Sequence, residues 1–327
     1  MTRVAAVDCG TNTIRLLVAD LTREETGRPR LEPLRRRNEI VRLGQGVDRT
    51  GLLDPAALER TLAVVEDYAA DCAELGVEPG RGARRFVATS ATRDARNRED
   101  FAAGVRSLLG VDPEVVSGQE EAHLSFAGSL LGARGTDDGG APRLVVDLGG
   151  GSTELVLGVD APTAAISLNT GSVRLTERYL ADGVTPAAEA AARAEVRGLL
   201  DRAAQAVDLA ATGRLVGLAG TITTVTAHAL GLADFDAEAI DGAELAVGAA
   251  LASCDEIVHS TAAERESWAY LRPGRRDVIA AGALVWSEVI SRVVAETTAA
   301  GRPLATAVTS LHDILEGIAL SLAVPVP

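Results

Sequence analysis

Two carboxylates flank a run of three glycines near the middle of the chain. Asp147 follows an apolar run, residues 149–151 are all glycine, and Ser152 and Thr153 precede Glu154. Consecutive glycines let a ligand approach the backbone closely, and successive N–H groups in such a turn can bind an anion. Two carboxylates beside a bound phosphate would repel it unless a divalent cation lay among them. The pattern therefore indicates a phosphate and metal site, with a glycine-rich hairpin that binds no ligand as the alternative.

A second pair of acids, Glu120 and Glu121, follows Ser117 at an expected helix start. A serine followed three residues later by glutamate fits a capping box, in which the Glu120 side chain would reach back to the backbone N–H of Ser117. Glu121 has no such role and could project into a site, so we favour Glu121 over Glu120 as a general base. The alternative is that both acids only complement the dipole of the helix.

Arginines beside turns of small residues are a third feature. Arg93 follows a run of small hydroxyl residues after an expected strand, where it either binds a phosphate or is solvated. Arg174 lies behind Gly171-Ser172 at a helix start, and Gly220-Thr221 forms a similar strand-to-helix turn. Whether Arg174 or Gly220-Thr221 contacts a ligand stays open. The run Arg35-Arg36-Arg37 most often marks a solvated strand end, and ligand binding is its less common role.

Composition excludes several classes of protein. The chain has no lysine, since all 32 Lys+Arg positions are arginine, and this excludes a Walker A lysine, a kinase strand lysine and Schiff-base chemistry. The net charge of −14 disfavours nonspecific attraction of nucleic acid, so we expect no nucleic-acid partner. The three cysteines are far apart and fit neither a disulfide framework nor a zinc ribbon. Without a membrane-spanning apolar run or a signal-peptide pattern, we expect a cytoplasmic protein with no membrane partner.

The glycine run and its two flanking acids lie in one copy of an internal repeat. Val4–Asp20 has the pattern of a strand, a turn and a second strand, like the segment around the glycine run. When the two segments are aligned, Asp8 matches Asp147. Arg15 takes the place of Glu154. One repeat at about half the chain length indicates a duplicated domain, each copy of which opens with the same hairpin.

The length of 327 residues favours two domains. We place them at 1–128 and 129–327, with a last helix that could pack back onto the first domain, and the loop-rich stretch 132–142 is the best candidate linker. Strands alternate with helices along both halves, which predicts a mixed α/β fold. Late in the chain, Asp241 is expected to cap a helix that runs towards His259.

Together these motifs resemble the exopolyphosphatase/guanosine pentaphosphate phosphohydrolase family, called Ppx/GppA, over nearly the whole chain. The matching stretches are residues 6–17, 42–47, 88–93, 117–122, 147–155, 171–177, 220–221 and 275–279. The chain looks most like the short form of the family, since it ends where longer members add a C-terminal helical domain of the HD type.

The resemblance implies an α/β fold of two duplicated actin-like ATPase (ribonuclease H-like) domains around an interdomain cleft. It implies an exopolyphosphatase that hydrolyses the terminal phosphoanhydride of inorganic polyphosphate, in short chains, and releases orthophosphate with Mg²⁺ or Mn²⁺. Glu121 would be the general base, and Asp147 and Glu154 would take the metal-linked role. The residues expected to hold phosphates are Asn12, Thr13, Arg93, Gly149, Gly150, Gly151 and Ser152.

Three other functions share many of these features. The nearest is a pppGpp 5′-phosphatase, which performs the same chemistry on guanosine pentaphosphate. A second is a sensor that binds polyphosphate or guanosine tetraphosphate without turnover, and a third is an actin-like ATPase or kinase. We also expect the chain to form a homodimer.

Overall fold

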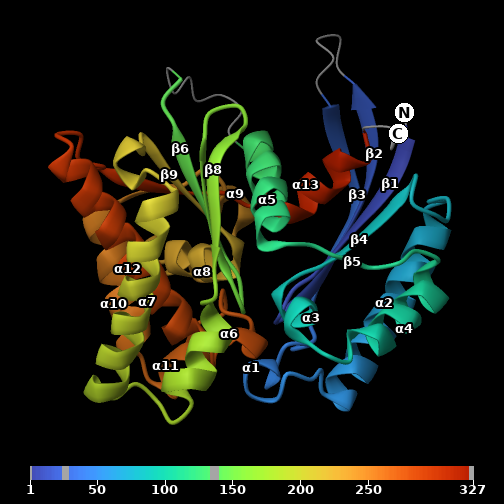
Figure 1. Ribbon diagram of the computed structural model, residues 1–327, viewed down its shortest axis with the longest axis horizontal. Helices are drawn as coiled ribbons and strands as arrows, with labels where there is room; N and C mark the ends of the chain where they lie inside the picture. Colours follow the sequence, from blue (N-terminus) through green and yellow to red (C-terminus); the bar gives the residue numbers. More distant parts are fainter. Residues whose placement is uncertain (1, 24–28, 133–139, 324–327) are drawn as a thin grey trace. The chain divides into compact units, whose positions relative to one another are not determined.

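The two hairpins of the internal repeat begin two separate sheets (Figure 1). The computed structural model describes residues 2–23, 29–132 and 140–323. The chain divides into a first unit, residues 1–128 with 314–327, and a second unit, residues 129–313. Residues 133–139 of the expected linker, 132–142, lie outside the described residues.

The first unit contains a five-stranded sheet of order β3-β2-β1-β4-β5. β2 is antiparallel to β1 and β3, whereas β4 and β5 run parallel to β1. The strands are β1 (Thr2–Cys9), β2 (Thr13–Arg23), β3 (Pro29–Ile40), β4 (Arg84–Ala88) and β5 (Glu114–Val115). The helices are α1 (Val47–Thr50), α2 (Pro55–Glu74), α3 (Ser90–Asp94), α4 (Arg98–Leu109), α5 (Gly118–Gly132), whose last residues belong to the second unit, and α13 (Ile314–Ser321).

Alternating residues of β1 give the first sheet an apolar surface on both faces, because successive strand side chains point to opposite sides. Val7 shares a core with Tyr68 of α2 and Phe101 of α4. Ala6, on the opposite face, shares a core with Leu315 of α13. The last helix of the chain therefore covers one face of the first sheet.

The three consecutive arginines of β3 are ion-paired to helices on both faces of this edge strand. Arg35 and Arg37 pair with Asp71 of α2, at N···O distances of 2.6 and 3.1 Å. Arg36 pairs with Glu316 of α13. The run therefore has a structural role that neither sequence interpretation, solvation or ligand binding, included.

The second unit contains a six-stranded sheet of order β10-β11-β9-β6-β7-β8. The strands are β6 (Arg143–Leu148), β7 (Thr153–Gly158), β8 (Pro162–Leu168), β9 (Arg214–Leu218), β10 (Glu244–Ala246) and β11 (Thr306–Thr309). The helices are α6 (Ser172–Leu175), extended by a π-helical turn (Thr176–Leu180), α7 (Pro186–Ala206), α8 (Ala219–Ala229), α9 (Ala237–Ile240), α10 (Val247–His259), α11 (Ala262–Ser267) and α12 (Ile279–Ala299), with 3₁₀ turns at Leu209–Ala211 and Pro273–Arg275. In the described part of the chain, no helix combines the length and apolar character needed to cross a membrane.

The second sheet repeats the strand order of the first. Read from the outer hairpin strand, β8-β7-β6-β9-β11 corresponds to β3-β2-β1-β4-β5, and β10 adds an antiparallel edge strand. The hairpin registers also agree, since Asp8 lies opposite Arg15 and Asp147 lies opposite Glu154. Both sheets thus share one strand order, in which the second strand of the hairpin is antiparallel to the first. The predicted duplication and the α/β fold class are therefore confirmed.

The helix expected to begin at Asp241 begins instead at Val247. The intervening residues include β10, which pairs with β11. The Asp241 carboxylate accepts a hydrogen bond from the backbone N–H of Leu311 at 2.8 Å, next to that strand. The expectation was wrong because strand pairing with a distant segment overrides the local capping signal.

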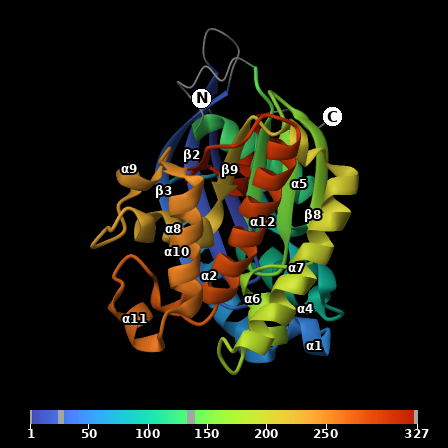
Figure 2. The ribbon, with the colours of Figure 1, turned by 90° about the vertical axis from the view of Figure 1, so that its left-hand side faces the viewer.

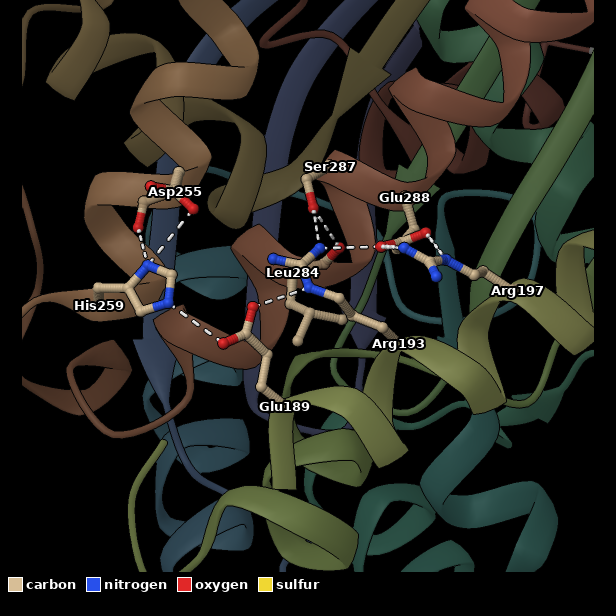
Figure 3. A network of polar contacts seen from close by, with 8 residues as sticks. All are labelled: Glu189, Arg193, Arg197, Asp255, His259, Leu284, Ser287 and Glu288. Atoms are coloured by element: carbon tan, nitrogen blue, oxygen red, sulfur yellow. Dashed lines mark hydrogen bonds and ion pairs between the residues drawn. The ribbon is translucent and has the colours of Figure 1, made fainter. Parts of the chain in front are cut away.

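Helices α7, α10 and α12 pack together in the second unit (Figure 2) and are joined by a polar network (Figure 3). Glu288 of α12 is only 5% exposed and accepts hydrogen bonds from Arg193 and Arg197 of α7, at 2.8 and 2.7 Å. Glu189 accepts from Arg193 at 2.8 Å and lies 3.1 Å from Nε2 of His259, the last residue of α10. The network thus ties the end of α10 to α7 and satisfies a buried carboxylate.

Candidate active site

The glycine run forms the turn of the hairpin that opens the second sheet. The N–H of Gly149 donates to the carbonyl of Ser152 at 3.0 Å and closes the turn between β6 and β7. Asp147 and Glu154 lie directly across from each other in the strand register and are 7% and 1% exposed. The hydroxyl of Ser167 on β8 donates to Glu154 Oε1 at 2.7 Å. The hairpin therefore holds two buried carboxylates next to a turn of small residues.

The carbonyl groups of all three glycines accept hydrogen bonds from residues 172–174. These bonds run from the N–H of Ser172 to Gly149 at 3.0 Å, from the N–H groups of Val173 and Arg174 to Gly150 at 2.9 and 3.0 Å, and from Nε of Arg174 to Gly151 at 2.8 Å. In a trans peptide the N–H that follows a carbonyl points the opposite way. The N–H groups of residues 150–152 thus point away from this segment. Among the described residues, no backbone carbonyl accepts a hydrogen bond from them.

Gly171 allows this segment to approach the turn. A Cβ at Gly171 would lie 2.6 Å from the carbonyl oxygen of Gly150 and 2.7 Å from that of Gly149. Its φ of −177° is extended backbone that any residue could adopt. The requirement for glycine therefore comes from the close approach of two backbone segments.

The hairpin turn of the first unit is supported in the same manner by the segment after β3. The N–H of Gly10 donates to the carbonyl of Thr13 at 2.9 Å, as Gly149 does to Ser152. The supporting bonds run from the N–H groups of Val41 and Arg42 to Asn12, at 3.0 and 2.9 Å, and from the N–H of Gly44 to Thr11, at 2.8 Å. The N–H groups of Asn12 and Thr13 accordingly point away from the supporting segment.

The two hairpins differ in the residue opposite the aspartate. In the first, Arg15 donates from Nε and Nη2 to Asp8 Oδ2 at 2.9 and 2.7 Å. In the second, the opposite residue is Glu154, so two acids face each other. Mg²⁺ is commonly bound by one or two carboxylates together with water and substrate phosphates, and this donor set fits such an ion. Elsewhere in the described residues, no cluster of three or more His, Cys, Asp or Glu side chains forms a fuller metal site.

Glu121 lies in the first turn of α5 and is 7% exposed. Arg93 of α3 donates from Nη1 to Glu121 Oε2 at 3.2 Å and to the carbonyl oxygen of Val116 at 2.8 Å. The main-chain contact holds the guanidinium in place and thereby orients the carboxylate. Arg93 and Glu121, two separate predictions from the sequence, are thus direct neighbours within the first unit.

Glu120 differs from Glu121 in both burial and partner. Its side chain is 47% exposed, and its Oε1 accepts from Arg85 of β4 at 2.8 Å. Its backbone N–H donates to the hydroxyl of Ser117 at 3.1 Å, which is one half of the expected capping box. The expected second half was wrong, because the carboxylate pairs with the charged donor of Arg85 in place of the Ser117 N–H.

The strand-to-helix turn at Gly220 is occupied by an arginine. A Cβ at Gly220 would lie 0.9 Å from Nη1 of Arg275, so this guanidinium packs directly on the backbone between β9 and α8. The preceding residue, Ala219, has a φ of 71°, a left-handed conformation that costs energy for a residue with a Cβ. Arg275 is not among the predicted site residues. Its only signal in the sequence is its place in the matching stretch 275–279.

The predicted site residues divide between the two units. The first unit holds Asn12 and Thr13 at its hairpin turn, with Arg93 and Glu121 in contact. In the second unit, one hairpin and its turn carry all the others, which are Asp147, Gly149, Gly150, Gly151, Ser152 and Glu154.

Comparisons with known proteins identify what this chain is similar to. The model of the Ppx/GppA phosphatase family matches residues 21–299. The chain is 45% identical to the protein named Exopolyphosphatase 2 in Mycobacterium tuberculosis, over 99% of both lengths. The crystal structure of an exopolyphosphatase-like protein is similar with a TM-score of 0.89 at 40% identity, over 98% of both chains. The Ppx/GppA family member of Aquifex aeolicus is similar with a TM-score of 0.74 at 26% identity, over 98% of this chain and 97% of its own.

Proposed function

Because this chain belongs to the Ppx/GppA phosphatase family, we propose that it is an exopolyphosphatase, which hydrolyses the terminal phosphoanhydride of inorganic polyphosphate and releases orthophosphate. The observation that carries the proposal is the 45% identity, over 99% of both lengths, to the protein named Exopolyphosphatase 2 in Mycobacterium tuberculosis. A match of that extent covers both units, so it does not depend on one motif-bearing segment.

The proposed general base is Glu121. Its carboxylate takes a proton from a water molecule as the water oxygen attacks the terminal phosphorus. The bond from that phosphorus to the bridging oxygen breaks, and the chain shortened by one phosphate leaves. The contact of Glu121 with Arg93, at 3.2 Å, supports this role because a base must be held in a fixed orientation. The exposed Glu120, paired with Arg85, is less suited to it.

The proposed phosphate-binding groups are the N–H groups of the two hairpin turns and the guanidinium of Arg93. In the second unit, the N–H groups of residues 150–152 point away from the supporting segment, as donors for phosphoryl oxygens would. In the first unit, Asn12 and Thr13 occupy the equivalent turn. Such local donors are needed because the net charge of −14 repels a polyanion.

Asp147 and Glu154 would hold Mg²⁺ or Mn²⁺. When bound, such an ion neutralises charge on the phosphoryl oxygens and stabilises the charge that develops during hydrolysis. The hydroxyl of Ser167 keeps one oxygen of Glu154 oriented by its hydrogen bond of 2.7 Å.

A substrate panel on one preparation tests the proposed function. Orthophosphate release is measured with Mg²⁺ from short polyphosphate, long polyphosphate, pppGpp and ATP. The expected result is a higher kcat/KM for polyphosphate than for either nucleotide. Faster release from pppGpp would identify a nucleotide phosphatase, and faster release from ATP would identify an ATPase. No release from any of the four would indicate a binding protein.

A further inference from the structure

Arg174 holds two successive carbonyl groups of the glycine turn. Its side chain is buried within a residue that is 8% exposed, at the third position of the short helix α6. Its backbone N–H donates to the carbonyl of Gly150 at 3.0 Å, and its Nε donates to the carbonyl of Gly151 at 2.8 Å. Nε of Arg174 thus contacts the back of the turn, on the side opposite to the N–H groups of residues 150–152.

The first hairpin shows what this side chain replaces. In the alignment of the two hairpins, Gly151 corresponds to Asn12, whose carbonyl accepts from two backbone N–H groups of the supporting segment. In the second hairpin the backbone of residues 172–174 donates to Gly149 and Gly150, and the third carbonyl is taken by the Arg174 side chain. The carbonyl of Gly151 is therefore held by one side-chain donor, whereas the equivalent carbonyl in the first unit is held by two main-chain donors.

The peptide between Gly151 and Ser152 most needs such a contact. It lies at the end of three consecutive glycines, where the backbone has the greatest conformational freedom. If this peptide rotated by half a turn, its carbonyl oxygen would point where the N–H of Ser152 now points. An oxygen there would repel an anion, whereas the N–H attracts one.

We infer that Arg174 is a positioning residue, which locks the Gly151–Ser152 peptide so that the N–H of Ser152 faces a bound phosphate. The inference rests on the proposed function to the extent that this turn binds phosphate. Arg174 acts through the carbonyl of Gly151, and the group that makes this contact is its donor at Nε.

Three substitutions separate the donor from the charge. Arg174→Gln places the amide nitrogen Nε2 where arginine has Nε, and so keeps a donor for Gly151 without the charge. Arg174→Lys keeps the charge but places a methylene group at that position. Arg174→Met removes both.

The measurement is the dissociation constant for orthophosphate in the presence of Mg²⁺, obtained from the rise in melting temperature as phosphate is added. Orthophosphate is the product and is not hydrolysed, so this readout does not depend on turnover. We expect Arg174→Gln to bind phosphate within about threefold of the wild type, and Arg174→Lys and Arg174→Met to bind at least about tenfold more weakly, since one hydrogen bond to a fixed carbonyl is at stake.

A matched control is Arg84→Met. Arg84 is also buried, 9% exposed, and donates to the carbonyl groups of Leu109 and Val77 at 3.0 and 2.7 Å, away from both turns. This variant is expected to melt at a lower temperature with an unchanged dissociation constant for phosphate. Loss of stability alone therefore does not imitate the expected result.

Several outcomes would overturn the inference. Tighter phosphate binding by Arg174→Lys than by Arg174→Gln would show that the charge acts on the phosphate directly. Phosphate binding by Arg174→Met equal to that of the wild type would show that the contact is dispensable, and a wild type without a phosphate-dependent shift would exclude the turn as a phosphate site. If Arg174→Met does not fold, the ranking of the other two variants decides. A wild type that binds phosphate but hydrolyses no polyphosphate contradicts the proposed function alone.

Discussion

Replacing Glu121 by glutamine tests the proposed chemistry most directly. Glutamine keeps the size of the side chain and a carbonyl acceptor, but it cannot take a proton at neutral pH. General-base catalysis typically contributes about 10²–10⁴-fold, so kcat should fall by that factor. The same factor corresponds to about 3–5 kcal/mol of activation free energy.

The structure indicates that this substitution should leave folding nearly intact. The side chains of Arg93 and Glu121 are 26% and 10% exposed, and Arg93 keeps its hydrogen bond to the carbonyl of Val116 at 2.8 Å. The glutamine oxygen can still accept from Arg93, so the free energy of unfolding should fall by only about 1 kcal/mol. The melting temperature should then fall by about 2–4 °C.

Glu120→Gln is the control, because it changes the neighbouring acid in the same way. Glu120 is 47% exposed and pairs with Arg85, and an exposed pair contributes about 0–1 kcal/mol. Its kcat should stay within about twofold of the wild type, since the residue has no proposed role in proton transfer. The assay is orthophosphate release from saturating polyphosphate, with melting curves for all three proteins. A Glu121→Gln protein that keeps more than about a tenth of the wild-type kcat would refute the assignment of the base, as would an equal loss in both variants.

Three further predictions concern the metal, the close approach behind the turn and the helix network. Ser167→Ala removes the donor to Glu154 at 2.7 Å, so the Mg²⁺ concentration for half-maximal activity should rise by about tenfold or more, and an unchanged Mg²⁺ titration would contradict the metal role of Glu154. Gly171→Ala places a Cβ 2.6 Å from the carbonyl oxygen of Gly150, so it should lower the free energy of unfolding by about 1–3 kcal/mol and weaken phosphate binding. The control is Gly198→Ala, whose Cβ would meet open space and which should have neither effect. The pKa of His259 is raised by its hydrogen bond to the Asp255 carbonyl and by Glu189, although burial acts in the opposite direction. The stabilising contribution of the charged His259 is therefore present below about pH 6.5 and is lost as the pH rises through the raised pKa. His259→Gln should therefore lower the melting temperature at about pH 5 and not at about pH 9, and an equal loss at both values would contradict the pairing with Glu189.

Local sequence patterns were sufficient to predict the mixed α/β fold and the duplicated hairpin that carries Asp147 and Glu154. Apolar runs on either side of a glycine run predict a hairpin, and the alignment of Asp8 with Asp147 predicts its second copy. The strand order of both sheets confirms the duplication. The capping-box pattern also separated the two acids at the start of α5, and they do differ in burial, although Glu120 pairs with Arg85 in place of the Ser117 N–H and the catalytic role of Glu121 stays a prediction.

The contacts that hold the site could not be predicted, because they join segments brought together only by folding. Arg174 and Gly151 are 23 residues apart, and they meet because β8 returns beside the hairpin. The need for glycine at position 171 comes from the same approach and has no local cause. In the same way, the arginines of β3 find their carboxylates on α2 and α13, and β10 forms only because β11 lies beside it.

The place of α13 in the first unit has a consequence for the order in which this protein can fold during synthesis. Leu315 and Ile318 of α13 complete the second core of the first sheet, and Gly317 lets the helix pass close to the main chain of Leu124, since a Cβ there would lie 1.9 Å from that carbonyl oxygen. A ribosome makes residues 129–313 before it makes this helix. The second unit therefore has all of its residues while the first sheet still exposes one apolar face to solvent or to a chaperone. The first unit, whose residues 1–128 are synthesised first, is thus the last to complete its hydrophobic core.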